Sequence, residues 1–112
     1  MTPLERLGLE VAAFTMIGSR AQAAVLCALL DAEGRFLEWD QIAVARPWKM
    51  GAFEASAATI KTRISLLRDA LEDLGFPGVI QSAGRKEGLR YALPDPGRGE
   101  IIARLVAEAS GA

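Results

Sequence analysis

The sequence predicts a single α+β domain, mostly α-helical, in which helices precede a β-hairpin and one further helix follows it. The chain has 112 residues, a length that suits one hydrophobic core. Of these residues 51% are hydrophobic and 24% charged, a composition too apolar for a disordered chain. Apolar side chains recur at helical spacing in several segments. A glycine-bounded basic segment separates two short runs typical of strands. We therefore treat residues 1–112 as one domain.

The composition argues against an enzyme. The chain contains no histidine, which excludes Ser-His-Asp and Cys-His chemistry, histidine metal ligands and the commonest general base. Cys27 is the only cysteine, so an internal disulfide and a cysteine-rich zinc site are excluded, and we expect an inert core residue. The neighbouring carboxylates Glu72 and Asp73 fall on an exposed helix face without a pocket. We expect a binding protein that uses neither a metal nor a cofactor.

A first helix is expected over residues 3–15. Thr2 can cap it, Pro3 suits the first helical position, and Glu5 can complete a capping box with Thr2. The apolar residues of this helix recur at three- and four-residue spacing: Leu4, Leu7, Val11 and Phe14. We expect residues 1–17 to form a helical extension that either covers the core or contacts a second copy of the chain.

Two more helices and a short strand are expected next. Ser19 and Gln22 form a second capping box, and the largely apolar helix that follows stops at Gly34. Residues 35–37 predict a very short strand, and residues 39–45 predict a short helix. These elements lead into the helix on which the functional hypothesis depends.

The clearest helix in the sequence runs from Ser56 to Leu74. Its apolar residues step by four and three residues along one stripe: Ile60, Ile64, Leu67, Leu71 and Leu74. Gly75 ends the helix, because glycine readily adopts the left-handed conformation that follows a helix terminus. This stripe is expected to face the core.

The opposite surface of this helix suits a nucleic acid. It presents small or polar residues with one leucine beside them: Ala58, Thr62, Ser65, Asp69 and Leu66. Other residues flank it on two sides: Lys61 and Arg68 on one, Thr59 and Arg63 on the other. Hydroxyl groups can contact phosphates or bases, and basic side chains attract phosphate. Asp69 opposes DNA, which confines the expected contact to the first turns. The alternative is a solvated face in which the basic residues pair with Asp69, Glu72 and Asp73.

A β-hairpin and a last helix complete the chain. Residues 79–82 and 89–93 predict two strands, and residues 83–88 form a basic tip between them. Residues 100–109 predict a terminal helix within the C-terminal segment 95–112. The predicted order is therefore four helices, a hairpin and a helix.

Positive charge gathers on the elements that would face DNA, although the net charge is only -1. Residues 1–40 hold three basic and six acidic side chains, a sum of -3. Residues 41–68 hold five basic side chains and one acidic, a sum of +4. Residues 85–98 hold four basic and two acidic side chains, a sum of +2. This distribution favours a nucleic-acid partner.

Three helices followed by a hairpin with a basic tip is the order of a winged helix-turn-helix. In that fold a three-helix core precedes a C-terminal β-hairpin wing; the third helix enters the major groove and the wing touches the flanking backbone or minor groove. We expect residues 18–94 to form this winged helix, with extra N- and C-terminal helices at 1–17 and 95–112.

Several stretches also match the motifs of one family. The most specific is TIKTRISLLRDALE at residues 59–72, which resembles the recognition-helix pattern TVDVHISRLRKKLE. SRAQAAVL at residues 19–26 resembles the opening helix of the family, and EGRFL at residues 33–37 the connection after it. VIQS to GLRY at residues 79–91 resembles the wing, IRTVRGxGYRL. On these motifs, residues 19–93 resemble the OmpR/PhoB-type winged-helix effector domain of bacterial response regulators.

The resemblance implies roles for particular residues. Four fall on recognition-helix positions that touch DNA in the family: Thr59, Arg63, Ser65 and Arg68. Arg85 or Lys86 falls near the wing arginine that enters the minor groove. The loop at 46–55 stands where some members contact RNA polymerase, which implies that enzyme as a further partner. Leu66 departs from the family, which often has a base-reading polar or basic residue there. The stretch before residue 19 resembles neither the four-stranded sheet of the family nor a receiver domain, so phosphorylation-driven activation is not implied.

We therefore expect a bacterial, cytoplasmic, sequence-specific DNA-binding regulator of transcription that binds double-stranded DNA as a homodimer. Its recognition helix spans about 56–74 and its wing 83–90. The residues expected to bind DNA are Thr59, Lys61, Thr62, Arg63, Ser65, Arg68, Arg85, Lys86 and Arg90. No apolar run is long enough to span a membrane, and the N-terminus lacks a signal-peptide pattern.

Two rival hypotheses use the same fold. One is a phage- or plasmid-type adaptor that binds RNA polymerase or another regulator without reading DNA. Leu66, a sequence pI near 5.4 and a partner-binding loop favour it. The residues of that loop are Trp48, Lys49 and Phe53, whose aromatic rings either bind a partner or pack onto the protein. The other rival is a small DNA-packaging subunit.

Overall fold

The computed structural model describes residues 3–43, 56–84 and 89–110. It is an α+β structure, mostly helical, with one small antiparallel sheet. The helices are α1 (Pro3–Ile17), α2 (Arg20–Asp31), α3 (Trp39–Ala43), α4 (Ala57–Asp73) and α5 (Gly97–Ala109). The strands are β1 (Leu37–Glu38), β2 (Gln81–Ala83) and β3 (Arg90–Ala92). Within the described ranges, no helix is both long and apolar enough to cross a membrane.

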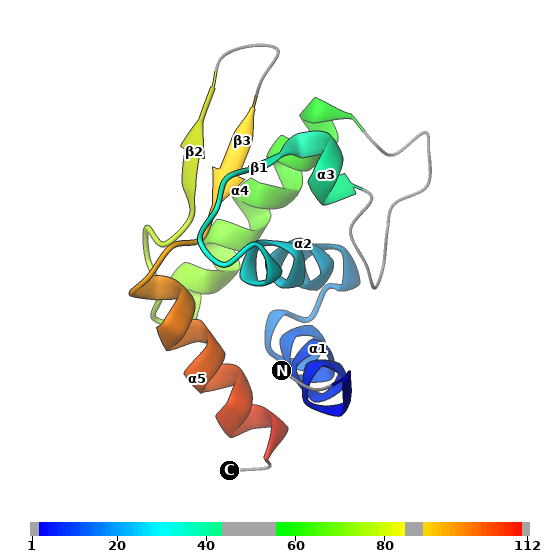
Figure 1. The fold of residues 1–112 in the computed structure, drawn as a ribbon, viewed down its shortest axis with the longest axis vertical. Helices are drawn as coiled ribbons and strands as arrows, with labels where there is room; N and C mark the ends of the chain where they lie inside the picture. The colour runs from blue at the N-terminus through cyan, green and yellow to red at the C-terminus, as the bar shows by residue number, and fades with distance from the viewer. Residues whose placement is uncertain (1–2, 44–55, 85–88, 111–112) are drawn as a thin grey trace.

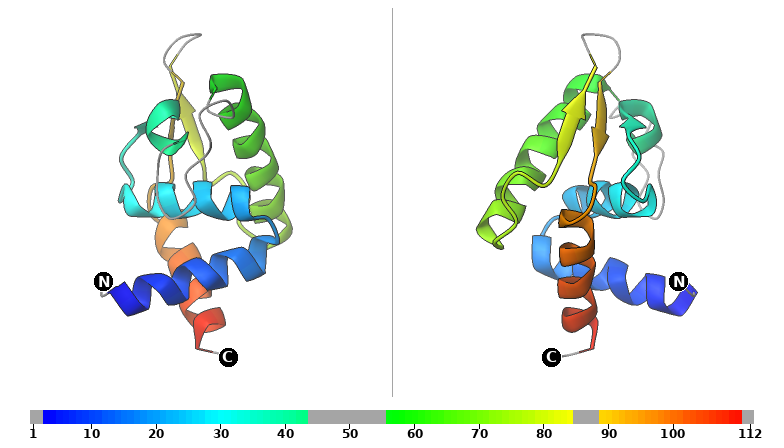
Figure 2. Two further views of the ribbon diagram at one scale, coloured as in Figure 1. Left: turned by 90° about the vertical axis from the view of Figure 1, so that its right-hand side faces the viewer. Right: turned by 60° about the vertical axis from the view of Figure 1, so that its left-hand side comes forward.

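The molecule is elongated, with extents of 42 × 27 × 23 Å. In Figure 1, α2 lies near the middle, the sheet and α3 lie on one side of it, and α1 and α5 lie on the other. Helix α4 runs beside the sheet and reaches α2, an arrangement that the two views of Figure 2 also show. The sheet and α4 therefore occupy one end of the molecule and the terminal helices the other.

Three strands pair in the order β1-β3-β2. Strand β3 is central: Tyr91 stands opposite Leu37 on one side and opposite Ser82 on the other. The predicted hairpin is confirmed, with strands shorter than expected. The predicted short strand starts two residues later and ends one residue later than expected, and its partner is β3. Because β1 and β3 are far apart in sequence, that pairing could not be predicted from local pattern.

Helix ends mostly follow the predicted signals. The Ser19 hydroxyl accepts a hydrogen bond from the Gln22 backbone N–H at 3.4 Å. The return bond of the predicted capping box differs, because the Gln22 carboxamide oxygen accepts from the Ser19 hydroxyl rather than from its backbone. At α4, the Ser56 hydroxyl accepts from the Thr59 backbone N–H at 3.1 Å. Gly75 ends α4 with φ of 95°, as predicted.

Helix α5 begins at Gly97, three residues before the expected start at Glu100. Glycines at 97 and 99 have poor helix propensity, which is why the sequence favoured a later start. The Asp95 carboxylate accepts a hydrogen bond from the Gly99 N–H at 3.0 Å and so satisfies a first-turn donor. A Cβ at Gly97 would lie only 2.8 Å from Val79 Cγ1, so the close packing of α5 against the segment before β2 requires glycine there.

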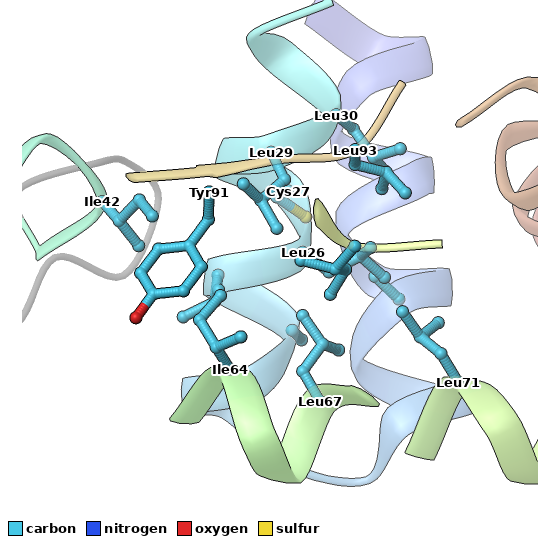
Figure 3. Packing of buried hydrophobic residues seen from close by; sticks show 14 of the residues in the cluster. Leu26, Cys27, Leu29, Leu30, Ile42, Ile64, Leu67, Leu71, Tyr91 and Leu93 are labelled. Carbon is cyan, nitrogen blue, oxygen red and sulfur yellow. The ribbon is translucent and has the colours of Figure 1, made fainter. Parts of the chain in front are cut away.

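The core lies where α2 meets α4, β3 and α5, as Figure 3 shows in part. Every residue of α2 from Ala23 to Leu30 is buried, including Cys27. The predicted α4 stripe is fully buried through Leu71, while Leu74 is half-buried. The stripe of α1 behaves differently: Val11 is 56% exposed and Phe14 39%, because the smaller residues Ala12 and Ala13 are the buried ones.

Candidate nucleic-acid interface

Helix α4 turns a mixed polar face to solvent, opposite its buried stripe. The exposed residues of this face are Ala58, Lys61, Thr62, Ser65, Leu66 and Asp69. Thr59, Arg63 and Arg68 lie at its margins and are half-buried. The structure thus brings together, on one helix, all six of the α4 residues predicted to bind DNA. We call these nine residues, six exposed and three half-buried, the α4 face.

In Figures 1 and 2, the first turns of α4 and the end of the hairpin farthest from α5 lie at the same end of the molecule. Arg90 is exposed at the start of β3, close to that end, and stands opposite Glu38 in the neighbouring strand. The predicted wing residues Arg85 and Lys86 lie outside the described residues, as do Trp48, Lys49 and Phe53.

Hydroxyl groups of the α4 face are partly engaged within the helix. The Thr59 hydroxyl accepts from Ser56 Oγ at 2.8 Å, and the Thr62 hydroxyl donates to the Ala58 carbonyl at 3.1 Å. The Thr62 oxygen therefore keeps lone pairs that can accept from a base or a backbone amide. Ser65 is exposed on the same face and can donate to a phosphate or a base.

Arg68 connects α4 to the hairpin. One terminal guanidinium nitrogen donates to the Ile80 backbone carbonyl at 3.2 Å, just before β2 begins. A guanidinium carries five N–H donors, so this bond leaves others for a phosphate. The resemblance pointed to Arg68 only as a DNA contact. Its second role, positioning the hairpin relative to α4, has no local sequence signal because Ile80 lies 12 residues away.

Arg63 lies on the other margin of the α4 face. Its Nε atom is buried and has no hydrogen-bond partner among the residues that the structure describes. A buried donor without a partner is costly, so an oxygen acceptor for this N–H group would be stabilising. Arg63 as a whole is half-buried, and its guanidinium carries further N–H donors besides Nε.

Acidic residues limit how far a polyanion can extend along α4. Asp69, Glu72 and Asp73 are all exposed in its last turns. All three basic residues of α4 come before these acidic residues in the helix, and Arg68 is adjacent to Asp69. This placement of charge favours phosphate contacts in the N-terminal part of α4, which stays a prediction.

Tyr91 lies beneath this interface. Figure 3 shows its ring from β3 between Ile42 of α3 and Ile64 of α4. Burial raises the pKa of the Tyr91 phenol above its ordinary 10.0, because the phenolate loses hydration. The positive charge of Arg68 acts in the opposite direction and is the smaller influence on this pKa.

A separate cavity lies at the opposite end of the molecule, among α1, α2 and α5. Its lining combines apolar residues with three charged ones and the cysteine: Leu9, Glu10, Cys27, Leu30, Asp31, Arg98, Ile102 and Leu105. Its volume of about 40 Å³ admits a few water molecules, whereas a small-molecule site needs several hundred Å³. Arg98 Nε donates to the Leu30 carbonyl at 2.9 Å, which joins α5 to the end of α2.

Neither family models, nor curated proteins, nor solved structures compared with this chain match it. The function must therefore be inferred from the residues and geometry of the chain itself.

Proposed function

We propose that the chain is a winged-helix regulator of transcription that binds double-stranded DNA sequence-specifically. In this proposal α4 enters the major groove and the hairpin, as the wing, contacts the flanking backbone or minor groove. The observation that supports it most is the α4 face, whose hydroxyl and basic side chains stand at the same end of the molecule as the hairpin.

Each part of the interface has a proposed role. Lys61 and Arg63 neutralise phosphates on either side of the groove, while Thr62 and Ser65 reach base edges or phosphate oxygens. Arg90 and the wing residues Arg85 and Lys86 extend the contact beyond the groove that α4 occupies. RNA polymerase, as a further partner of the loop at 46–55, stays a prediction.

A homodimer is part of the proposal. Val11 on α1 and Val106 on α5 are 56% and 51% exposed, so both terminal helices present apolar surface. These helices lie at the end of the molecule opposite the α4 face, which leaves that face accessible. Two copies on a two-part site would raise the affinity of a chain whose net charge is -1.

The DNA contact is tested by Lys61→Gln. Lys61 is exposed on α4, so its replacement leaves the core intact. We expect weaker binding to duplex DNA, and a slope of log affinity against log salt that is shallower by about 0.9 for the lost phosphate contact in each protomer. Mobility-shift titrations at several salt concentrations measure both quantities.

The matched control is Arg104→Gln, which removes one positive charge from α5 at the far end of the molecule. Arg104 is exposed and pairs with Glu108 at 3.3 Å. Its loss should leave the salt slope unchanged. If both variants alter binding equally, or neither does, α4 does not contact the phosphates.

A protein-binding adaptor is the second candidate function. The acidic residues Asp69, Glu72 and Asp73, all exposed on α4, favour it because they repel a polyanion. Retention on random duplex DNA at low salt discriminates between the two functions. A DNA-binding protein is retained, and charge reversal at Arg85 and Lys86 abolishes the retention. An adaptor that does not read DNA flows through.

A further inference from the structure

Leu66 is an apolar side chain on an otherwise polar and basic surface. It is 48% exposed, although four other apolar residues of α4 are fully buried. Its neighbours on the α4 face are Thr62, one turn earlier, and Ser65, the preceding residue. The four buried residues already fill the side of α4 that faces the core, so the packing of the core does not account for an exposed leucine at position 66.

A protein-docking surface explains Leu66 poorly. Docking surfaces on monomers are contiguous apolar patches of several hundred Å². Every residue of α4 is described, and Leu66 is its only exposed large apolar side chain. One leucine among hydroxyl and charged groups is too small for such a patch. It does suit a partner that offers one apolar group among many polar ones.

Duplex DNA is such a partner. In the major groove, adenine, guanine and cytosine present hydrogen-bond donors and acceptors, and thymine alone presents a methyl group. Leucine can neither donate nor accept a hydrogen bond. Against any other base edge, leucine would displace water from polar atoms without replacing the lost hydrogen bonds. Facing the thymine C5-methyl, it removes two apolar surfaces from water together.

We propose that Leu66 is a specificity-determining residue that selects thymine through its C5-methyl group. This inference rests on the proposed function, since it requires α4 to lie in the major groove. Thr62 and Ser65, which precede Leu66 on the same face, supply polar contacts, and Leu66 supplies the apolar discrimination beside them. The site bound by the protein then contains a thymine at the position that faces the middle of α4.

The test uses a duplex selected from a random pool by the intact protein. Each thymine of that duplex is replaced in turn by deoxyuridine, which keeps the base pairing and removes only the methyl group. We expect at least one position at which the replacement weakens binding about fourfold, the value of one buried methyl group. Leu66→Ala should bind the thymine and deoxyuridine duplexes equally at that position.

A matched control separates this effect from a general loss of apolar surface. Phe36→Ala removes an apolar side chain of similar exposure, 43% against 48% for Leu66, that lies outside α4 and both terminal helices, so it should keep the thymine preference. Circular dichroism checks that both variants are folded.

The outcomes distinguish this inference from the proposed function. Binding of the duplex without any methyl-sensitive thymine, or with a sensitivity that Leu66→Ala retains in full, overturns the role of Leu66 and leaves DNA binding standing. An equal loss of binding to both duplexes in Leu66→Ala also overturns it. If the wild-type protein binds no duplex from the pool at low salt, the proposed function and this inference fail together.

Discussion

Single residues at the margins of the α4 face belong both to the fold and to the proposed interface. Arg68 bonds to the Ile80 carbonyl and stands near Tyr91, so its charge reaches the core as well as the surface. Arg63 has a buried Nε without a partner in the described part of the chain. Such residues cannot be sorted into structural and functional classes from residue type alone.

Tyr91 makes stability depend on pH at the alkaline end. Because its pKa is raised in the folded state, the unfolded chain loses the phenolic proton first. The free energy of unfolding that Tyr91 contributes should be complete below pH 10 and should fall as the pH rises further. Urea denaturation across this range, compared with Tyr91→Phe, measures the difference.

The chain has one tyrosine, so the ultraviolet absorbance of tyrosinate reports Tyr91 directly. In the folded protein the titration should lie at higher pH than in urea. Coincident titrations, or a Tyr91→Phe variant with the same alkaline loss of stability, would contradict the effect of burial.

At the scale of elements, periodicity and caps predicted the helices well. The buried stripe of α4 and its end at Gly75 follow from spacing and backbone preference, which are local properties. The early start of α5 is different, because it places Gly97 in close contact with Val79, a residue distant in sequence that lies just before β2. Tertiary contacts of this kind override propensity and have no signature in the segment itself.

Replacing a helical glycine by alanine should therefore change the free energy of unfolding in opposite directions at Gly97 and at Gly8. Gly97→Ala should lower the free energy of unfolding by about 1–3 kcal/mol, because the new Cβ meets Val79 at 2.8 Å. Gly8→Ala in α1 should raise it by about 0.5–1 kcal/mol, since a Cβ there meets only Ala109 Cβ, at 3.9 Å. Urea denaturation of the two variants measures both changes. If both substitutions change the free energy of unfolding in the same direction, the close packing of Gly97 against Val79 is contradicted.

The candidate site was also only partly predictable. The basic and hydroxyl residues of α4 and their common face follow from helical geometry, so the sequence was sufficient for them. The Arg68–Ile80 bond and the half-buried state of Arg63 depend on how the hairpin and α3 pack beside α4. The spacing predicted that α1 carries an apolar stripe, but it did not predict which of its residues face solvent. That depends on Ala12 and Ala13 allowing close packing.

The whole molecule separates its two proposed contacts: the first turns of α4 lie near the end that carries the hairpin, and α1 and α5 lie at the other end. Val11→Asp places a charge on the exposed surface of α1 and should weaken self-association at least tenfold without unfolding the chain. Sedimentation equilibrium over a range of concentrations measures the association.

Phe36→Asp is the control, because Phe36 is 43% exposed and precedes β1, away from both terminal helices. It should associate as the wild type does. A wild-type chain that stays monomeric at every concentration would exclude the homodimer, and equal effects of both substitutions would exclude α1 as its interface.

The bond from Arg68 to Ile80 has a consequence for the spacing of a binding site. It joins α4 to the base of the hairpin, so the separation between the two DNA-contacting elements is set by the protein rather than by the nucleic acid. Under the proposed function, one extra base pair between the two contacts would shift the second by about 3.4 Å and rotate it around the duplex axis. Under the proposed function, elements held at a fixed separation make the spacing of two contacts along the duplex, as well as the bases, a determinant of which sites are bound.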